Sequence, residues 1–305
     1  MHKLKGYIMV IIASSFWGIS GTVAQSLFSE DKVTVEWLVT VRLLISGILF
    51  LLYVYFKNGK EDLFQIFRNK SYVLHFVIFG ILGMFSVQYT FFVAINEGNA
   101  AVATLLQYIA PVFIMIYYLI VLKLKPMLVE MLAVVLALSG TFLILTNGSL
   151  QAISISMTAF WWGISSAVAL AFYLLYSGFL VKQFSSFIVM GYGMLIGGLA
   201  SLTIHFPLTA NIKLWDWKTI VSIVFIIIFG TIVPFFLYSE SLRYINAKET
   251  SLLGCTEPLA AIIVSIIWLG TPFGINQAIG SLFIMIMVLL LSLRKPKNSA
   301  AIRGK

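Results

Sequence analysis

A glutamate followed by a proline interrupts a long apolar stretch of this chain. Glu257-Pro258 lies within residues 251–269, where nearly all the neighbours are Leu, Ala, Ile and Val. In hydrocarbon a carboxylate has no water to solvate its charge, and proline removes a backbone donor from a helix. Because such a pair is costly deep in a membrane, we expect it to serve a function.

Two kinds of chemistry suit Glu257. Burial favours the neutral form of a carboxyl group, so Glu257 could hold and release a proton, or it could meet a substrate ammonium. The alternatives are a structural carboxylate bonded to a neighbouring helix and a protonated carboxyl group without a function. No metal or cofactor is expected. Cys255 is the single cysteine, and His2, His75 and His205 show no metal-ligand spacing.

Arg42 is the one cation that falls clearly within a predicted membrane span. Glu36, six residues earlier, is too far round the helix to be an obvious partner. A structural ion pair, or a side chain that extends to the outer surface, is one interpretation of Arg42. Contact with the substrate is the other.

Uncharged polar and aromatic residues are predicted at the same central depth as Glu257. They are Trp17, with Ser14 one turn earlier, and Gln88, Tyr89, Gln107, Tyr108, Tyr173, Tyr176 and Tyr238. Tyr and Trp offer apolar faces with a polar edge, which suits amphipathic organic solutes, and Trp can hold a cationic amine by cation–π attraction. Any one of them could instead pack between helices. As a group they predict a substrate cavity lined by part of the set.

Pro111, Pro234 and Pro258 interrupt three apolar segments at mid-depth. Proline frees backbone carbonyl groups that can face a water-filled cavity. It also offers a bending point for alternating access, so the three prolines are candidate hinges. A static kink is the alternative for each.

The composition indicates whether the protein folds in water or in a lipid bilayer. Of 305 residues, 61% are hydrophobic and 10% are charged, and the mean hydropathy is +1.03. Soluble domains are nearer half apolar and a quarter charged, so the chain is predicted to be an all-α integral membrane protein. The net charge of +9 does not indicate nucleic acid, because the basic residues cluster in short loops and at the C-terminal tail.

Apolar runs of about 20 residues, enough to cross a bilayer, predict ten transmembrane helices. They fall near 6–27, 35–56, 72–95, 99–122, 127–146, 157–181, 187–206, 219–244, 249–270 and 274–293. If the N-terminus is cytoplasmic, the basic residues in the loops on the outer side of the membrane are only Lys32, Lys213 and Lys218. The other loop lysines and arginines then lie on the cytoplasmic side, as the positive-inside rule requires. A cleaved signal peptide is the alternative for the first run, which is longer than a usual signal core. We expect a multi-pass protein of the cell (cytoplasmic) membrane with both termini in the cytoplasm.

The two halves of the chain share a short pattern. An offset of 147 residues (258 − 111) places Pro111 on Pro258 and Asn99-Ala100 on Asn246-Ala247. With five helices in each half, the second half enters the membrane from the opposite side. The chain is thus predicted to contain two inverted-topology repeats, residues 1–146 and 157–293, followed by a basic cytoplasmic tail, 294–305.

These motifs resemble the EamA family of the drug/metabolite transporter superfamily. The resemblance rests on Trp17 in Ala13-Ser14-Ser15-Phe16-Trp17-Gly18, on Arg42 in Val39-Thr40-Val41-Arg42-Leu43-Leu44, and on the small-residue runs that lead to Pro111 and to Glu257-Pro258. It covers nearly the whole chain. One departure is Glu130 in the fifth helix, where the second half has Gln277. The resemblance implies export or exchange of small metabolites such as amino acids.

The predicted function is secondary transport of small organic metabolites, such as amino acids or amines, outward by alternating access. A passive facilitator or channel for such metabolites is the alternative. An enzyme is not expected, because no paired acids or metal cluster occurs, and no Walker A motif indicates direct use of ATP. The expected partners are a small-molecule metabolite, the lipid bilayer and protons, without nucleic acid; a homodimer is left open.

Overall fold

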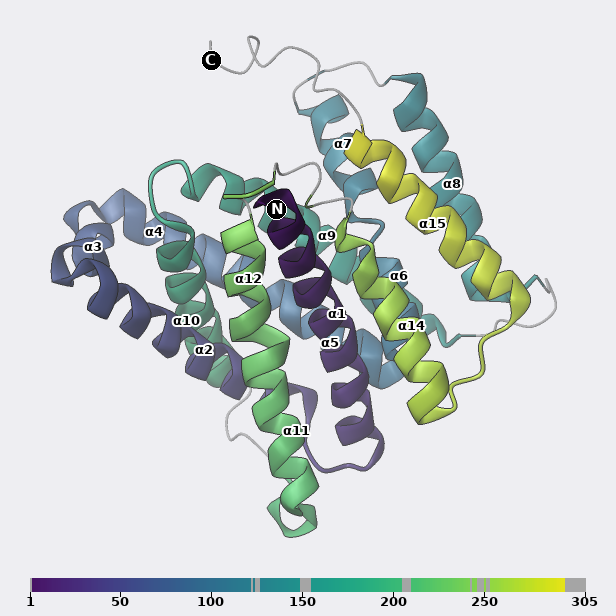
Figure 1. The fold of residues 1–305 in the computed structure, drawn as a ribbon, viewed down its shortest axis with the longest axis horizontal. Helices are drawn as coiled ribbons and strands as arrows, with labels where there is room; N and C mark the ends of the chain where they lie inside the picture. The colour runs from purple at the N-terminus through teal and green to yellow at the C-terminus, as the bar shows by residue number, and fades with distance from the viewer. Residues whose placement is uncertain are drawn as a thin grey trace.

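The protein is helical, as the composition predicts. The computed structural model describes residues 2–121, 123, 127–148, 155–204, 210–241, 243–245, 250 and 253–293 (Figure 1). Within these ranges the extended structure amounts to an isolated bridge between Val33 and Ala210. The predicted tail, 294–305, and Asn246-Ala247 of the repeat pattern lie outside the described residues.

The helices follow one another with short connections. The first half holds α1 (His2–Ser29), α2 (Val35–Asn58), α3 (Lys60–Phe64), α4 (Lys70–Ile78), α5 (Ser86–Glu97), α6 (Ala100–Gln107), α7 (Ala110–Ile120) and α8 (Leu128–Thr146). The second half holds α9 (Met157–Leu180), α10 (Ser186–Ile204), α11 (Trp217–Ile227), α12 (Val233–Ser241), α14 (Thr256–Leu269) and α15 (Ile275–Leu293). Two π-helical segments, η2 (Phe79–Phe85) and η4 (Ile228–Ile232), join α4 to α5 and α11 to α12.

Seven helical stretches in the described part of the chain are long and apolar enough to cross a membrane. Three shorter apolar helices accompany them, at Leu128–Ile144, Thr256–Leu269 and Ile275–Leu290. Each predicted range overlaps one of these stretches, but the predicted ranges 72–95, 99–122, 219–244 and 249–270 are interrupted rather than regular. Three of these interruptions lie beside Pro111, Pro234 and Pro258, where the sequence predicts them. The one within 72–95 contains no proline and was not predicted, because the apolar run continues through it. The count of ten membrane spans stays a prediction.

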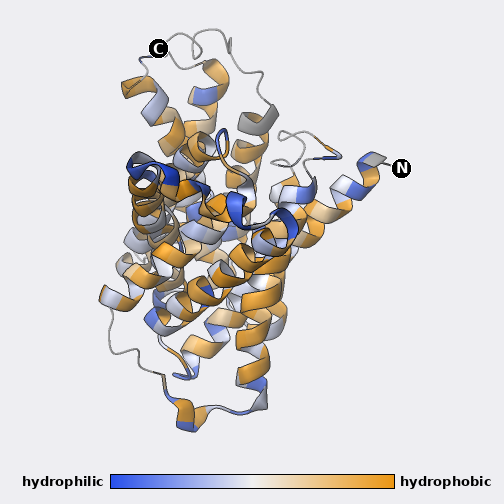
Figure 2. Cartoon of the chain, turned by 90° about the vertical axis from the view of Figure 1, so that its left-hand side faces the viewer, coloured by the Kyte–Doolittle hydropathy of each residue, from blue (hydrophilic) through white to orange (hydrophobic). Residues whose placement is uncertain are grey.

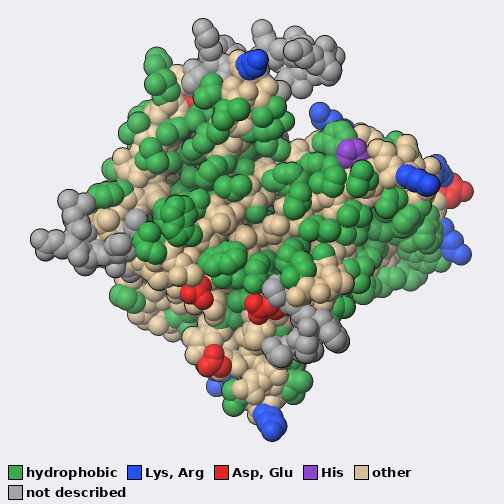
Figure 3. Space-filling view, turned by 180° about the vertical axis from the view of Figure 1, so that it is seen from behind, with side chains coloured by type: hydrophobic (Ala, Val, Ile, Leu, Met, Phe, Trp, Pro, Cys, Tyr) green, Lys and Arg blue, Asp and Glu red, His purple; other side chains and the backbone are tan. Residues whose placement is uncertain are grey.

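The outward faces of the helices are apolar. Leu128, Ile275 and Phe56 are 83%, 82% and 81% exposed. Figure 2 shows hydrophobic residues along the helices and hydrophilic ones mainly near their ends, and Figure 3 shows hydrophobic side chains spread over the rear face. Soluble proteins rarely expose such broad apolar surfaces. The surface therefore suits a lipid bilayer.

Among the described helices that begin at one end of the molecule, four start with a side-chain cap. The capping residues are Thr34 of α2, Asn99 of α6, Ser156 of α9 and Asp216 of α11. Hydrogen bonds from the Thr219 hydroxyl and backbone N–H lower the pKa of the exposed Asp216 carboxyl to about 2. Lys32 lies at this end, where its backbone carbonyl accepts hydrogen bonds from the backbone N–H of Asn211 and from Trp215 Nε1. We call it the Lys32 end and the opposite one the Lys5 end, where Lys5 contacts Tyr244.

The helices pair in a pattern that is symmetric between the halves. Helix α1 packs against α12 and α14, and α9 packs against α5 and against α6 and α7 (Figure 1). Helix α2 packs against α10, and α8 against α15. If the halves are exchanged, so that α1 takes the place of α9, α5 of α12 and α6–α7 of α14, the contacts of α1 become those of α9. The pairs α2–α10 and α8–α15 each join corresponding helices of the two halves.

Glycines let the paired helices approach closely. A Cβ atom on Gly140 would lie 2.7 Å from the carbonyl oxygen of Gly280. A Cβ atom on Gly18 would lie 2.8 Å from the backbone nitrogen of Ala261 and nearer still to the carbonyl oxygen of Glu257. Small residues serve such contacts between membrane helices. Gly18 thus sets how closely α14, and Glu257 with it, can approach α1.

Candidate functional site

The helix that carries Glu257 begins at a break in the chain. Helix α14 starts at Thr256, directly after a turn at Cys255, and Pro258 is its third residue. In the first half, Tyr108 and Ile109 separate α6 from α7, and Pro111 is the second residue of α7. Proline is tolerated in a first helical turn, where its missing N–H costs no hydrogen bond. The two breaks, at Tyr108 and Cys255, share the 147-residue offset (255 − 108) of the two prolines.

Pro234 occupies a different kind of irregularity. It is the second residue of α12, directly after the π-helical segment η4. The π-helical segment η2 precedes α5 in the corresponding place of the first half, without a proline. π-helical turns loosen the regular hydrogen-bond ladder and are frequent at functional sites. All three predicted hinge prolines thus follow an irregular backbone, while hinge motion itself stays a prediction.

Tyr108 connects the two helix breaks. Its hydroxyl lies 2.9 Å from Glu257 Oε2 and 2.8 Å from the carbonyl oxygen of Gly254. Tyr108 stands at the break of the first half, and Gly254 and Glu257 flank the break of the second. Two of the predicted site residues, Tyr108 and Glu257, are therefore in direct contact between the halves.

This contact depends on the protonation of Glu257. The Tyr108 hydroxyl has one proton, and the Gly254 carbonyl can only accept. If Glu257 is ionised, it also only accepts, and the two oxygens compete for that proton. If Glu257 is protonated, it can donate to Tyr108 while Tyr108 donates to Gly254. Only the protonated carboxyl satisfies both contacts at once.

Aromatic side chains from three further helices complete this site. The ring centroids of Trp17 and Tyr238 lie 5.4 Å apart. Tyr238 lies close enough to Glu257 and Cys255 to interact electrostatically, and Tyr173 close enough to Tyr238. We call these residues the central cluster, which consists of Trp17, Tyr108, Tyr173, Tyr238, Cys255 and Glu257. Trp17, Tyr108, Tyr173, Tyr238 and Glu257 are half-buried rather than sealed in the core.

Arg42 lies buried on α2, with 4% of its surface exposed. Its Nε donates to the Thr231 hydroxyl and its Nη2 to the Gly230 carbonyl at 2.8 Å, both in η4. Its guanidinium also lies 5.0 Å from the centre of the Phe92 ring. Within the described residues it has no ion pair with a carboxylate, and it does not reach the surface. The structure thus shows neither of the two structural interpretations drawn from the sequence.

Three other predicted residues carry polar groups without a hydrogen-bond partner among the described residues. The Ser14 hydroxyl is fully buried and unpaired. Gln107 is 8% exposed, and its side-chain amide makes no hydrogen bond to the described chain. Gln88 is half-buried on α5 in the same condition. None of the three contacts Glu257 through a hydrogen bond.

Tyr176 and Tyr89 lie away from the central cluster. The Tyr176 hydroxyl is 2.7 Å from His75 Nδ1, toward the Lys5 end. Tyr89 donates to Glu36 Oε1 at 3.3 Å, toward the Lys32 end. Tyr89 and Tyr176 were predicted at the same depth as Glu257, but they do not contact the central cluster through these hydroxyl groups.

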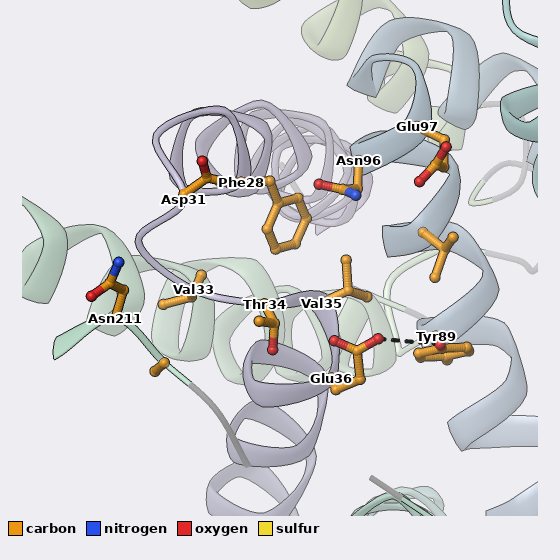
Figure 4. Close-up of a pocket in the computed structure, with 12 residues that line it drawn as sticks. Phe28, Asp31, Val33, Thr34, Val35, Glu36, Tyr89, Asn96, Glu97 and Asn211 are labelled. Atoms are coloured by element: carbon orange, nitrogen blue, oxygen red, sulfur yellow. Dashed lines mark hydrogen bonds between the residues drawn. The ribbon is translucent and has the colours of Figure 1, made fainter. Parts of the chain in front are cut away.

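A pocket of about 720 Å³ opens where Tyr89 meets Glu36 (Figure 4). Its lining residues come from the ends of α1, α2 and α5 and from the segment before α11, and they include Asp31, Glu36, Asn96, Glu97 and Asn211. No sequence pattern indicates this pocket, because its acidic residues lie at separate helix ends. No group of three or more His, Cys, Asp or Glu residues in the described ranges could hold a metal ion.

Several known proteins are similar to this chain in sequence or in fold. A family model for the EamA-like transporter family matches residues 4–146 and again residues 157–293. The uncharacterized inner membrane transporter YicL of Salmonella typhimurium is 32% identical over 303 residues, covering 97% of this chain and 98% of YicL. The uncharacterized transporter YyaM of Bacillus subtilis is 25% identical over 313 residues and 97% of each chain. A crystal structure of a protein with 15% identity has a TM-score of 0.63 over 96% of both chains, which shows a shared fold.

The family match and the relatives agree with the motifs around Trp17, Arg42, Pro111 and Pro258. Both relatives are named as transporters, and each aligns over nearly its whole length. The apolar helices place the chain in a membrane as a multi-pass protein. This chain is a membrane transporter that belongs to the EamA-like transporter family.

Proposed function

We propose that this transporter is a secondary carrier that exports small organic metabolites, such as amino acids or amines, by alternating access. The observation that carries the proposal is the contact of Tyr108 with Glu257 and Gly254, which joins the broken helices of the two halves. A carboxyl group beside Trp17 and Tyr238 suits a solute with an ammonium group and an apolar body. Broken helices near the centre of a membrane domain are where many secondary carriers bind substrate.

The halves would act as two inverted-topology repeats of five helices. The family model matches the two halves separately, which supports two related units. The symmetric helix pairing, the corresponding π-helical segments and the matching breaks at Tyr108 and Cys255 support them as well. Rocking of one unit against the other would then open the central cluster to each side in turn.

The Lys5 end would face the cytoplasm. Lys5, Lys57, Lys60 and Lys70 lie at this end, and the described lysines of the opposite end are Lys32, Lys213 and Lys218. Positive charge is enriched in cytoplasmic loops. The protein would thus sit in the cytoplasmic membrane with both termini inside, and the acidic pocket of Figure 4 would face outward.

Protons would drive the export. The Tyr108 hydroxyl can hold Gly254 and meet Glu257 at once only when Glu257 is protonated, so the proton would stabilise this arrangement of the two breaks. Loss of the proton makes the Gly254 carbonyl and the carboxylate compete for one donor. Loss of the proton from Glu257 would therefore weaken the hydrogen bond from Tyr108 to the Gly254 carbonyl, which belongs to the backbone at the helix break.

Tyr108→Phe is expected to slow transport about tenfold or more. The substitution keeps the ring and removes the hydroxyl, which leaves the Gly254 carbonyl and the Glu257 carboxyl without this partner, and an unsatisfied buried polar group costs about 1–3 kcal/mol. Tyr192→Phe is the matched control, because the Tyr192 hydroxyl also donates to a backbone carbonyl, that of Leu63 at 2.8 Å, but lies outside the central cluster. Initial rates in proteoliposomes would compare the two variants. Equal losses would remove the special role of Tyr108.

Reconstituted protein tests the proposed function directly. Proteoliposomes would be loaded with a radiolabelled amino acid or amine, and efflux followed with and without a pH gradient. Unlabelled substrate on the far side should accelerate the exchange, because a carrier returns faster when loaded. A channel would show no such acceleration, and a passive facilitator would show no transport driven by the pH gradient. Absence of transport for every amino acid and amine tested would contradict the substrate class.

A further inference from the structure

The connection between α2 and α4 is a short helical segment at the Lys5 end of the molecule. It contains α3 and the 3₁₀ turn η1 (Gln65–Arg68), and the helical stretches on either side are long and apolar enough to cross a membrane. Gly59, with a φ of 89°, turns the chain between α2 and α3. The Asn69 side chain accepts a hydrogen bond from the Ser71 N–H and caps α4. Residues 60–70, which we call the 60–70 segment, therefore lie where two membrane-spanning stretches end.

The inner face of the 60–70 segment is held against the body of the protein. Ile66 is buried, and the Leu63 carbonyl accepts a hydrogen bond from the Tyr192 hydroxyl of α10 at 2.8 Å. The ring centroids of Phe67 and Tyr192 lie 6.0 Å apart. These contacts fix which side chains of so short a segment face outward.

The outer face of the segment combines aromatic rings with basic groups. Phe64 and Phe67 are each more than half exposed, and their ring centroids lie 6.1 Å apart. Lys60 precedes the two rings, Arg68 and Lys70 follow them, and all three side chains are exposed. Figure 3 shows Lys and Arg side chains beside hydrophobic ones at its right-hand edge, where α3 lies. Exposed Phe beside Lys and Arg is typical of segments that lie between the headgroups and the acyl chains of a bilayer.

The basic side chains of this face have no partner in the described part of the chain. Lys60, Arg68 and Lys70 form neither an ion pair nor a side-chain hydrogen bond with a described residue. The neighbouring carboxylate of Asp62 accepts a hydrogen bond from Asn58 Nδ2 at 2.9 Å instead. Three cations on one short segment are therefore available to an anion from outside the chain.

We propose that the 60–70 segment binds an anionic phospholipid of the adjacent leaflet. The phosphate would lie among Lys60, Arg68 and Lys70, and the acyl chains would lie against Phe64 and Phe67. Clusters of basic residues directly beside a membrane span attract anionic headgroups, and each such residue strengthens the binding about fivefold. A soluble anion would use the basic groups but leave both rings exposed to water, so a lipid fits the whole face. This lipid site is separate from the central cluster and from the proposed carrier function.

A lipid titration of the purified protein tests this site. The protein in detergent micelles with phosphatidylcholine would be titrated with phosphatidylglycerol while Tm is followed, because a ligand of the folded state raises Tm. The amount of phosphatidylglycerol at half-saturation should rise about tenfold or more in the double variant Lys60→Gln, Arg68→Gln. The double variant Phe64→Ala, Phe67→Ala should also weaken the binding, because the acyl chains lose their contact.

The double variant Lys213→Gln, Lys218→Gln is the matched control. It removes the same number of positive charges from exposed positions at the Lys32 end, beside the carboxylate of Asp216. Half-saturation should stay within about twofold of wild type, because an acidic neighbour offsets the attraction of these lysines for an anionic headgroup. If both double variants weaken the binding equally, the net charge of the protein is responsible and the 60–70 segment is not the site.

Two results on the wild type alone would also overturn the inference. If phosphatidylcholine raises Tm as far as phosphatidylglycerol does, the segment does not select an anionic headgroup. If inorganic phosphate raises Tm as far as phosphatidylglycerol does, the basic groups bind a soluble anion and not a lipid. Both comparisons need no variant, so they decide the question even if a double variant does not fold.

Discussion

Glu257→Gln is expected to abolish the part of transport that a pH gradient drives. The amide has nearly the same size and can still accept a hydrogen bond from Tyr108, but it cannot take up or release a proton. Exchange at equal pH on both sides should fall much less, because it needs no net proton movement and loses only the charge that Glu257 offers to a substrate ammonium group. The ratio of gradient-driven transport to exchange should therefore fall at least tenfold. Both rates can be measured on the same proteoliposomes.

Glu240→Gln is the matched control for this experiment. Glu240 forms an ion pair with Arg243 at 3.2 Å near the Lys5 end, outside the central cluster. An ion pair of this kind contributes on the order of 0–1 kcal/mol, so the ratio should stay within twofold of wild type. If Glu257→Gln keeps the wild-type ratio at every pH, Glu257 does not carry the coupling proton.

Gly18→Ala is expected to cost both stability and transport. The new methyl group would collide with the Glu257 carbonyl and lie 2.8 Å from the Ala261 nitrogen, so α1 and α14 must move apart. Overpacking of a close contact costs about 1–3 kcal/mol, which corresponds to a loss in Tm on the order of 5 °C. Transport should fall about tenfold, because the shift moves Glu257 relative to Trp17 and Tyr108. Thermal unfolding in detergent and efflux assays would measure the two effects.

Gly178→Ala makes the same chemical change where space is free. No atom lies within 4 Å of a Cβ built at Gly178, which is exposed on α9. Alanine favours a helix over glycine by about 1 kcal/mol, so this variant should be at least as stable as wild type. A similar fall in Tm for both variants would show that the contact of α1 with α14 is not the cause.

Several features were accessible from the sequence because they depend on local composition. Apolar runs indicated membrane helices, since about 20 such residues are needed to cross hydrocarbon. The unusual cost of Glu257 and Arg42 in such runs marked both as candidates. The motifs around Trp17 and Pro111 led to the EamA family, which the family match confirms.

Other features depend on residues that are distant in the chain. The acceptors of Arg42 are a backbone carbonyl and a threonine in η4, nearly 190 positions away. A backbone carbonyl has no sequence signature, so the sequence pointed to a carboxylate partner or the surface instead. The acidic pocket likewise appears only when Asp31, Glu36 and Glu97 are brought together by folding. Tyr89 and Tyr176 were predicted to lie near Glu257 because of their equal depth in the membrane. In the structure Tyr89 contacts Glu36 and Tyr176 contacts His75 instead.

The sequence by itself determined the membrane environment, the helical class, the family, and Glu257-Pro258 as the costly pair within an apolar run. Hydrophobic burial and proline geometry act locally, so these conclusions needed no tertiary contact. The tertiary structure decided that the partner of Glu257 is Tyr108, and that this hydroxyl also reaches Gly254. Such a hydrogen bond requires an approach below about 3 Å, which depends on how α1, α6 and α14 pack and not on any single segment.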